Sequence, residues 1–379
     1  MSRDRVLIVH NRHRWIGGEE RSVELHADAL AAANVEHRLL ERDSATAGAF
    51  RAGRSLLSGG WRPDEVGRAA AEFGASVAHF HSFQPLFGAR AMTAARDAGA
   101  RVVVHLHNFR LFCAISVAFR DGAPCFRCRG RLTLPGVALN CRGSVPEALV
   151  YGVGLAAQQP EVLAAADRFI APSTFAAGQL ARLGVPADAI EPIPHYLPDD
   201  RIATRSLAAD GTYAVAAGRL APEKGFEVAI DAAAASGVPL RLAGGGPLEG
   251  DLRRHADAIG APVEFAGVLS RAELDELRRG AAMAVVPTVG SESFGFTALE
   301  AMGAALPVIA TRSGALPELL GVERCLPRRD VTALAARMRA LWDDPERRAH
   351  EGAALAARAA SEYGRARFTE RLLGLYARL

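Results

Sequence analysis

Short runs of β-branched and other apolar residues alternate with longer Ala, Leu and Arg stretches of helical period along most of this 379-residue chain. Such alternation is typical of βαβ units, whose parallel strands are covered by helices on both faces of a sheet. The strands that we expect form two series: first Arg5–Asn11, Val35–Glu41, Val77–Ser82, Arg101–Asn108 and Arg168–Ser173, and then Thr212–Leu220, Pro239–Gly244, Val263–Val268, Ala282–Pro287, Pro307–Thr311 and Arg324–Pro327. The sequence therefore predicts two α/β domains.

The segment between the two series is rich in proline. Glu191–Asp200, which reads EPIPHYLPDD, carries three prolines within seven residues. Because proline disfavours a helix both at its own position and at the residue before it, we expect an extended connector that acts as a hinge. The predicted domains are residues 1–195 and residues 196–360, followed by a C-terminal helix at 361–379 that packs back on the N-terminal domain.

Composition limits the partners of the chain. A mass of 40.1 kDa with 50% apolar residues exceeds what one hydrophobic core usually organises. The net charge of +3 comes from scattered basic and acidic residues, so we expect small-molecule ligands and no nucleic acid. The start, MSRDRVLIVHN, lacks a signal-peptide pattern, and no stretch reaches 18 uninterrupted apolar residues. We therefore expect a cytoplasmic protein without a transmembrane segment; the sequence leaves open a peripheral membrane contact and the oligomeric state.

Two cations follow the first strand of the second series. Ligands of open parallel sheets bind outside the carboxyl ends of the strands. This strand runs through Gly218 and Arg219 into APEKG, where Lys224, the single lysine among 45 basic residues, opens a helix. Two cations at a helix N-terminus form an anion site. The alternative is a solvated pair at a helix start.

Glycines and carboxylates follow two further strands. Gly244–Gly246 form a turn without side chains, which lets a ligand approach the backbone. Glu292 lies in the loop after the fourth strand of this series, and Glu300 lies in the helix that follows. A carboxylate accepts hydrogen bonds from the vicinal hydroxyls of a sugar or ribose, although either residue could be an ordinary surface carboxylate. The anion site at Arg219 and Lys224, together with the carboxylates of Glu292 and Glu300, predicts a site for a nucleotide sugar.

The motifs GRLAPEKG, LAGGGP and ESFGFTALE resemble, in order and spacing, the donor-site motifs of glycosyltransferase family 4. The resemblance implies the α/β GT-B fold, in which two Rossmann-like domains with parallel sheets face a central cleft. It also implies a retaining hexosyltransferase that takes part in glycoside or polysaccharide biosynthesis.

The same resemblance implies roles for single residues. Arg219 and Lys224 would bind the donor diphosphate and stabilise it as it leaves. Glu292 would hold the hydroxyls of the donor sugar, and Glu300 the ribose. The backbone at Val268 would meet the base. The further donor-site positions are Gly218, Gly245, Ser293, Phe294, Gly295 and Phe296.

The first domain resembles the family more loosely. Gly17 and Gly18 resemble its glycine loop, which approaches the donor phosphate and the acceptor, although they could also form a purely structural turn. His107, in HLHNFR, resembles the histidine that lines the reaction centre; the alternative is a packed core residue. His81 is a lesser candidate. We expect the other histidines near these strands to be core or supporting residues: His10, His79 and His105.

The chain departs from the family pattern in two places. Ser313 stands where the family more often has two adjacent glycines, and the connector differs from the commoner Pro-Asn-Gly type. We expect the serine to alter contacts near the sugar without abolishing activity.

Four of the five cysteines fall within one segment. Cys125 and Cys128 form a C-x-x-C pair, with Cys113 twelve residues before it and Cys141 thirteen residues after it. Four thiolates could close a tetrahedral structural zinc site, whereas the alternative is a loop of reduced thiols. Cys325 belongs to a predicted strand, where we expect it to be buried.

The predicted reaction needs no metal cofactor. No Asp-x-Asp pair follows a strand, so the protein itself must supply the cations that hold the diphosphate. By resemblance, the acceptor hydroxyl attacks from the face that the nucleotide leaves, and the anomeric configuration is retained. Two alternatives remain: a nucleotide-sugar 2-epimerase on the same architecture, and a catalytically silent sugar-binding protein.

Overall fold

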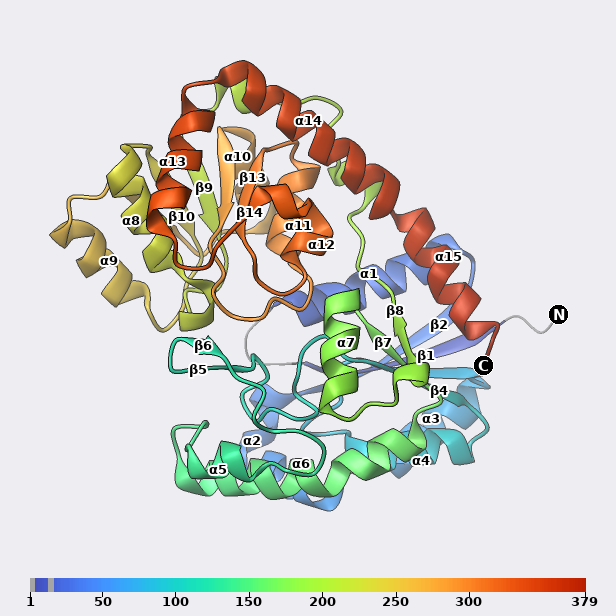
Figure 1. Ribbon diagram of the computed structural model, residues 1–379. Coiled ribbons are helices and arrows are strands. Elements are labelled where there is room, and N and C mark those ends of the chain that lie inside the picture. Colours follow the sequence, from blue (N-terminus) through green and yellow to red (C-terminus); the bar gives the residue numbers. More distant parts are fainter. Residues whose placement is uncertain (1–3, 13–16) are drawn as a thin grey trace. The chain divides into compact units, whose positions relative to one another are not determined.

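The computed structural model describes residues 4–12 and 17–379, which fold into two compact units (Figure 1). Within the described residues, the first unit extends to Ala118 and includes Cys125–His195 and Ala366–Leu379. The second unit consists of Phe119–Pro124 and Tyr196–Arg365. That these units behave as the domains expected at 1–195, 196–360 and 361–379 stays a prediction.

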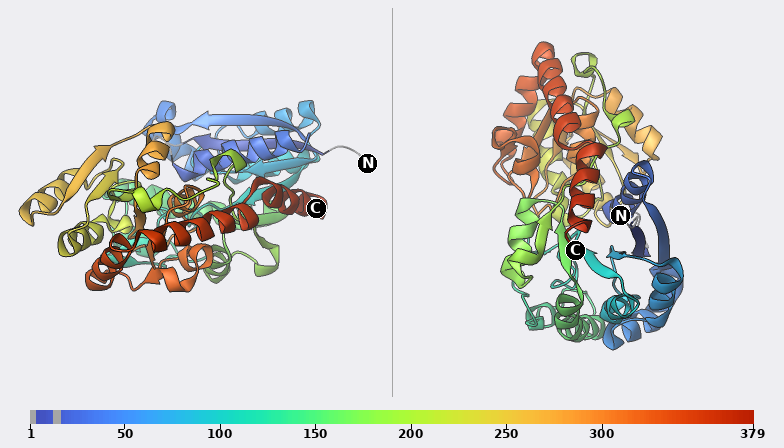
Figure 2. Two further views of the ribbon diagram at one scale, coloured as in Figure 1. Left: turned by 90° about the horizontal axis from the view of Figure 1, so that it is seen from above. Right: turned by 90° about the vertical axis from the view of Figure 1, so that its right-hand side faces the viewer.

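The first unit is built on a six-stranded parallel sheet with the order β2-β1-β3-β4-β7-β8. Its strands are β1 (Arg5–Arg12), β2 (Glu36–Asp43), β3 (Val77–Phe80), β4 (Arg101–His105), β7 (Arg168–Ala171) and β8 (Ile190–Pro192). Its helices are α1 (Gly18–Ala32), α2 (Ser44–Ser58), α3 (Asp64–Phe73), α4 (Gly88–Asp97), α5 (Leu134–Ala138), α6 (Val145–Ala165), α7 (Thr174–Leu183) and α15 (Arg365–Tyr376), whose first residue belongs to the second unit. Figure 2 shows α15, in red, beside the blue N-terminal elements of this unit.

The second unit has another six-stranded parallel sheet, with the order β11-β10-β9-β12-β13-β14. Its strands are β9 (Ala214–Ala217), β10 (Leu240–Ala243), β11 (Val263–Gly267), β12 (Met283–Val286), β13 (Val308–Thr311) and β14 (Cys325–Leu326). Its helices are α8 (Phe226–Ser236), α9 (Glu249–Ala258), α10 (Arg271–Arg279), α11 (Phe296–Gly303), α12 (Leu316–Leu320), α13 (Val331–Trp342) and α14 (Pro345–Glu362). In chain order the strands run 3-2-1-4-5-6, which is the strand order of dinucleotide-binding folds.

Burial explains why the strands could be recognised. Every residue of β3 and of β12 is buried, as expected for central strands covered by helices on both faces. All eleven predicted strands are present. Each sheet contributes buried apolar residues to a core of its own, in which Leu7 and Phe80 belong to the first unit and Leu299 and Val308 to the second.

Two short elements were not predicted. The connector begins with strand β8, which extends the first sheet at its edge, where the missing N–H of Pro192 is tolerated. The second is an antiparallel hairpin of β5 (Phe119–Arg120) and β6 (Ala123–Pro124), which belongs to the second unit although the sequence on both sides belongs to the first. Strands of two or three residues are too short to produce a periodic pattern.

Candidate functional site

The sheet of the second unit reverses its strand order between β9 and β12. In open parallel sheets, ligands bind at such a switch point, beyond the carboxyl ends of the strands. The loop after β9 carries Arg219 and Lys224, and the loop after β12 carries Glu292. The predicted cations and one predicted carboxylate therefore start from the two strands that flank the switch point.

Lys224 and Glu292 form an ion pair across these two loops. The Lys224 Nζ donates to Glu292 Oε2 at 2.6 Å, and the Thr288 hydroxyl donates to the same oxygen at 3.4 Å. The Lys224 side chain is 29% exposed and that of Glu292 is 16% exposed. An ammonium that is held by a carboxylate and still reaches solvent can bind a phosphate, while the carboxylate can accept hydrogen bonds from hydroxyls.

Backbone contacts hold the two loops together. The carbonyl of Glu223 accepts the N–H groups of Val289 and Gly290 at 3.0 and 2.9 Å. Gly225 has a φ of +65°, and a Cβ at this position would lie 2.4 Å from the carbonyl oxygen of Pro287. Only glycine allows this close approach of the two loops, so the backbone fixes Lys224 beside Glu292.

Arg219 is placed differently from Lys224. Its guanidinium is paired with the carboxylate of Glu223, four residues on. The Arg219 side chain is about half exposed, whereas Glu223 is mostly buried. Arg219 therefore remains available to a ligand at the carboxyl end of β9.

The predicted glycine turn brings three loops together. The N–H of Gly218 donates to Ala243, that of Gly244 donates to Gly267, and that of Leu220 donates to Gly245, at 2.7 to 3.0 Å. A Cβ at Gly244 would lie 1.9 Å from the carbonyl oxygen of Gly218, which explains the absence of a side chain. The exposed side chain of Val268 borders this turn, since a Cβ at Gly245 would lie 2.9 Å from its Cγ2.

The segment from Ser293 to Phe296 leads into helix α11. Phe294 is buried and packs edge-on against Phe296, with 5.3 Å between the ring centroids. The Phe294 side chain is thus part of the core, so only the backbone at this position can meet a ligand. Gly295, with a φ of +108°, directly precedes α11, whose first N–H groups lie outside the helical hydrogen-bond pattern.

Ser313, which stands where the family more often has glycine, forms a hydrogen bond between two loops of the second unit. It is fully buried, and its hydroxyl donates to the carbonyl oxygen of Gly290. The N–H of Ala315 donates to the carbonyl oxygen of Glu292 at 2.9 Å. The serine therefore links the loop after β13 to the loop that carries Glu292.

Glu300 has a buried partner that the sequence did not indicate. Its carboxylate is paired with the guanidinium of Arg278 on α10, and their side chains are 11% and 3% exposed. Burial lowers the pKa of Arg278 to about 10, so the residue still carries a proton at neutral pH. Arg278 also contacts Asp275 at 3.3 Å. No motif marks Arg278, because its helix is an ordinary charged surface helix in its sequence pattern.

In the first unit, the glycine loop leads into helix α1, which begins at Gly18; residues 13–16 of this loop lie outside the described residues. The N–H of Gly17 donates to Glu20 Oε2 at 2.9 Å. Glu19 accepts hydrogen bonds from Ser82, after β3, and from Asn108, after β4. Sequence reasoning missed Glu19, although its place in the first turn of a helix that follows glycines was visible.

His107 is buried at the carboxyl end of β4 among other histidines. Its Nε2 lies 2.9 Å from His81 Nδ1, and its ring stacks on His105 with 4.1 Å between the centroids. His10, His79 and His105 are buried, as predicted. Burial holds the pKa values of His79, His81 and His105 well below the usual value, so these rings are neutral at pH 7.

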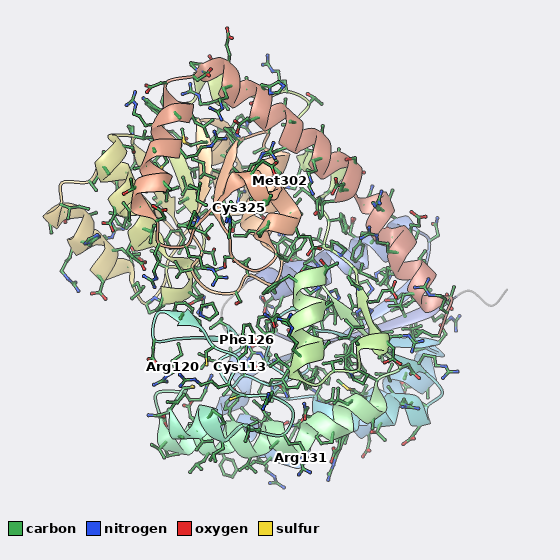
Figure 3. The ribbon with its side chains drawn as sticks, in the orientation of Figure 1. Cys113, Arg120, Phe126, Arg131, Met302 and Cys325 are labelled. Carbon is green, nitrogen blue, oxygen red and sulfur yellow. The ribbon has the colours of Figure 1, made fainter. Side chains whose placement is uncertain are left out.

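The side chains of the four clustered cysteines are partly buried in the first unit. Figure 3 labels Cys113 and Phe126, which pack against the same core, and Cys325, which is buried in the second unit as predicted. Burial raises the pKa of the Cys128 thiol to about 11. Among the described residues, the sets of three or more ligand atoms close enough to share an ion consist of histidines. The four-thiolate zinc site stays a prediction that metal analysis of the purified protein would test.

None of the helices in the described ranges is long and apolar enough to cross a membrane.

Family models match both halves of the chain. Residues 17–195 match the glycosyl transferase 4-like domain, and residues 211–344 match the glycosyl transferases group 1. The two matches cover the glycine loop and His107 in the first half, and the ion pair, the glycine turn and Glu300 in the second half.

Curated relatives match over parts of their length. The chain is 37% identical over 138 residues to the GDP-mannose-dependent alpha-(1-6)-phosphatidylinositol dimannoside mannosyltransferase of Mycobacterium tuberculosis, which is 34% of this chain and 35% of that protein. It is 32% identical over 250 residues to the D-inositol 3-phosphate glycosyltransferase of Acidothermus cellulolyticus, which is 59% of this chain and 55% of that protein. The chain thus matches about a third to a half of the length of these relatives.

A solved structure resembles the chain over its whole length. Anabaena HepE in complex with UDP and glucose has a TM-score of 0.69 and 16% sequence identity, covering 99% of this chain and all of that one. This likeness confirms the predicted fold class, α/β of the GT-B type.

Proposed function

This chain belongs to glycosyltransferase family 4, and we propose that it transfers a hexosyl group from a nucleoside-diphosphate sugar to an acceptor hydroxyl. The observation that carries the proposal is the ion pair of Lys224 and Glu292 at the strand-order switch of the second unit. A cation for the diphosphate and a carboxylate for the sugar hydroxyls lie next to each other there, beside a turn that leaves the backbone accessible.

The names of similar proteins support the donor class. The mycobacterial relative is named as GDP-mannose-dependent, and the Anabaena structure contains UDP and glucose. Both ligand sets combine a nucleoside diphosphate with a hexose. We therefore propose a nucleotide sugar as the donor and leave its base and its sugar to experiment.

The proposed chemistry is a retaining transfer without a metal ion. Lys224 and Arg219 would stabilise the negative charge of the diphosphate as the bond from the anomeric carbon to the phosphate oxygen breaks. The acceptor oxygen would form the new bond on the same face, and its proton would pass to a phosphate oxygen of the leaving group. The family resemblance supports this stereochemistry, and the absence of Asp-x-Asp pairs from the sequence supports the use of protein cations.

The test begins with a thermal-shift panel of UDP, GDP, ADP and dTDP, because the diphosphate that binds the folded state raises the melting temperature. Turnover of the corresponding nucleotide sugar is then measured with a panel of hydroxyl acceptors, with and without EDTA. We expect release of the nucleoside diphosphate together with an α-linked product from an α-linked donor. The rate of turnover should be the same with and without EDTA. An inverted product or a requirement for divalent ions would contradict the proposed chemistry.

The two alternative functions predict other outcomes of the same experiment. A 2-epimerase, which neither of the two relatives' names supports, would form a C2 epimer from the nucleotide sugar alone. A silent sugar-binding protein would show the thermal shift but no turnover with any donor and acceptor. Either outcome would replace the proposed transferase.

A further inference from the structure

Large apolar side chains are exposed on one layer of helices in the first unit. Eleven large apolar side chains are exposed among the described residues, and seven of them belong to α2, to α6, or to α5 and the residues just before it. Phe50 is 85% exposed, and the other six are 47 to 65% exposed. Gathered exposed apolar side chains mark an interaction surface. We call these seven the apolar face: Phe50, Leu57, Leu132, Leu134, Val145, Leu149 and Val153.

The three helices that carry the apolar face pack side by side, with α6 in the middle. On the α2 side, a Cβ at Gly154 would lie 2.6 Å from Leu56 Cγ. On the α5 side, a Cβ at Gly152 would lie 2.4 Å from Val137 Cγ2, and the Thr133 hydroxyl donates to the carbonyl of Gly152 at 2.7 Å. Figure 1 shows α5 and α6, in green, along the lower edge of the first unit with α2 beside them. Because the glycines let the helices approach closely, the three helices present one continuous surface.

The outer side of α6 carries an apolar stripe. Val145, Leu149 and Val153 follow one another at intervals of four residues, so they lie above one another on one side of the helix. The side of α6 that is turned to the interior carries Leu155 and Val162, which are fully buried. The stripe therefore lies outside the core of the unit.

Arginines accompany the apolar face, and carboxylates are missing from the same segments. Residues 44–63, which contain α2, and residues 125–146, which contain α5, hold seven arginines and no aspartate or glutamate. The whole chain, by comparison, has 45 basic and 42 acidic residues and a net charge of +3. This surface is thus cationic although the chain as a whole is nearly balanced. The seven arginines are Arg51, Arg54, Arg62, Arg127, Arg129, Arg131 and Arg142.

Most of these arginines are available to a partner. Arg62 and Arg142 are each paired with a glutamate at 3.0 Å. The other five are exposed and form no ion pair with any described residue. Arg131 Nε donates to the carbonyl of Ala156 at 3.3 Å, and Figure 3 shows this arginine beside α6. Unpaired cations therefore lie next to the apolar stripe.

We propose that the apolar face and its arginines form a surface with which the chain binds to an anionic lipid bilayer. The apolar side chains would enter the boundary between the headgroups and the acyl chains, while the guanidinium groups would bind the lipid phosphates. Helix α6 would lie along the membrane, because its other side is part of the core of the unit. This binding goes beyond the proposed function and does not rest on it.

Two other occupants match the face in one respect each. A nucleic-acid strand would bind the arginines through its phosphates, but it would leave the seven apolar side chains exposed. A second copy of the chain could cover the apolar side chains, but the unpaired arginines of the two copies would repel one another. A bilayer that contains anionic lipids is complementary to both kinds of side chain.

Sedimentation of the full chain with lipid vesicles tests the proposal. The protein should sediment with vesicles of phosphatidylcholine that contain about 30% phosphatidylglycerol. Vesicles of phosphatidylcholine alone should bind it at least about tenfold more weakly, because each arginine near an anionic surface strengthens binding about fivefold. Added salt should weaken the binding by screening. Lack of binding to the anionic vesicles at low salt, or equal binding to both kinds of vesicle, would overturn the proposal.

The double variant Leu149→Ser/Val153→Ser tests the apolar stripe. Both side chains are exposed, so the melting temperature should change little, whereas binding to anionic vesicles should fall at least about tenfold as the apolar contact with the bilayer is lost. The matched control is Ile259→Ser/Val322→Ser, which removes two exposed apolar side chains from the second unit and should leave binding unchanged. Wild-type binding in Leu149→Ser/Val153→Ser would show that the stripe does not meet the bilayer.

The double variant Arg51→Gln/Arg54→Gln tests the cations. It removes two unpaired charges from α2 and should weaken binding to anionic vesicles about 20- to 30-fold at low salt. The control Arg253→Gln/Arg254→Gln removes the same net charge from α9 of the second unit and should stay within about twofold of the wild type. If both double variants weakened binding equally, only the net charge of the chain would matter, and the assigned surface would be wrong.

Two further outcomes separate the possible failures. If the wild type self-associates, Leu149→Ser/Val153→Ser stays monomeric in sedimentation velocity, and neither protein binds vesicles, a second copy covers the face and the membrane proposal is overturned. If the chain binds anionic vesicles as expected but turns over no nucleotide sugar, the proposed function fails while the membrane surface stands.

Discussion

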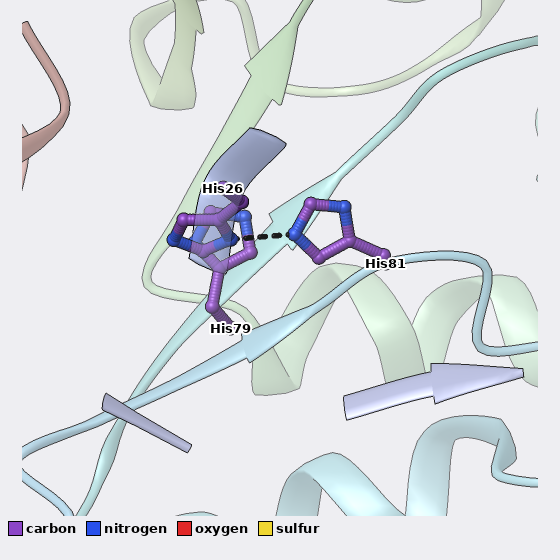
Figure 4. Close-up of side chains that lie close together, drawn as sticks. All are labelled: His26, His79 and His81. Carbon is purple, nitrogen blue, oxygen red and sulfur yellow. Dashed lines mark hydrogen bonds between the residues drawn. The ribbon is translucent and has the colours of Figure 1, made fainter. Parts of the chain in front are cut away.

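The loops after β9 and β12 in the second unit hold charged side chains that stay partly in solvent, whereas the histidine network of the first unit is buried; its members are His26, His79, His81, His105, His107, His195 and Tyr376. Lys224 and Glu292 are 29% and 16% exposed and form an ion pair. The rings of the network are nearly inaccessible, and burial holds the pKa values of His79 and His81 well below the usual value. The second unit is thus suited to neutralising an anionic ligand, whereas the histidines of the first unit form hydrogen bonds with one another in its interior (Figure 4).

The difference also concerns how each region is assembled. The charged site comes from short loops that backbone contacts of Glu223 and Gly225 hold together. The histidine network joins residues up to 350 positions apart in the chain, from His26 to Tyr376. We therefore expect the charged site to tolerate changes elsewhere in the chain, and the network to depend on the docking of α15.

The largest expected effect comes from acid. The unfolded chain takes up protons on histidine near pH 6.5, but folded His26 does not do so until about pH 3. The unfolded state therefore binds more protons in this window, and stability falls as the pH drops from about 6.5, by about 1.4 kcal/mol per pH unit for each such histidine. The pKa values of His79, His81, His105 and His195 are also lowered by burial. The first unit should open well before the second.

Hydrogen exchange between pH 7 and pH 4 checks this prediction. Peptides that cover β3 and β4 should lose protection before peptides that cover β12 and β13. His105→Leu removes one buried histidine, so the protection of the first unit should fall less steeply as the pH is lowered. Equal protection of both units down to pH 4 would show that the buried histidines do not make the first unit more sensitive to acid than the second.

The next effect concerns the buried pair in the second unit. Arg278→Met leaves the carboxylate of Glu300 buried without its cation and should lower the free energy of unfolding by about 3 to 5 kcal/mol. Urea unfolding measures the loss, and the double variant Arg278→Met/Glu300→Leu should regain most of it. Arg253→Met, which breaks an exposed pair with Glu249, is the control and should cost less than about 1 kcal/mol. If Arg278→Met and Arg253→Met lowered the free energy of unfolding equally, burial would not be the reason for the cost of breaking the pair.

Removal of the ammonium tests the charged site itself. Lys224→Ala should reduce turnover about 100- to 1000-fold while the melting temperature changes little, because one cation on the leaving group is worth about 3 to 4 kcal/mol in the transition state. Lys224→Arg should fall between Lys224→Ala and the wild type, since a planar guanidinium binds phosphate differently from an ammonium. Turnover at the wild-type level in Lys224→Ala would show that the charge is not used. Arg254→Ala, in an exposed pair with Asp251, is the control.

The smallest effect is expected at the departure from the family pattern. Ser313→Gly removes the hydrogen bond to Gly290 and should lower the free energy of unfolding by about 0.5 to 1.5 kcal/mol. Turnover should stay within a few-fold of the wild type, because the side chain is fully buried and acts through the loop. A loss as large as that of Lys224→Ala would mean that the serine contacts the ligand.

Much of the architecture and part of the site could be predicted from the sequence. Strands buried on both faces, such as β3 and β12, leave continuous apolar runs that a periodic pattern detects. Lys224 and Glu292 were expected in one site because each follows a strand, and the structure pairs them. Which strands flank the reversal of strand order was not visible, because strand order depends on long-range pairing.

The missed residues have no local pattern. Arg278 lies 22 residues before Glu300 on another helix, and its contact depends on how α10 and α11 pack. Tyr376 reads as one apolar position of an amphipathic helix, and nothing nearby indicates that its hydroxyl meets His26. Such contacts are set by tertiary packing, whereas the spacing of residues reports on single elements.

The hairpin at Phe119–Pro124 and the return of α15 have a consequence for recombination between relatives. A chimera that joins the first half of one protein to the second half of another at residue 195 leaves the hairpin and α15 in the wrong parental background. The hairpin would meet a foreign Arg329, which donates to Gly122 at 3.1 Å, and Tyr376 would meet foreign histidines. Exchanging donor specificity in this scaffold therefore requires four junctions, after residues 118, 124, 195 and 365, so that each segment stays with the unit on which it packs.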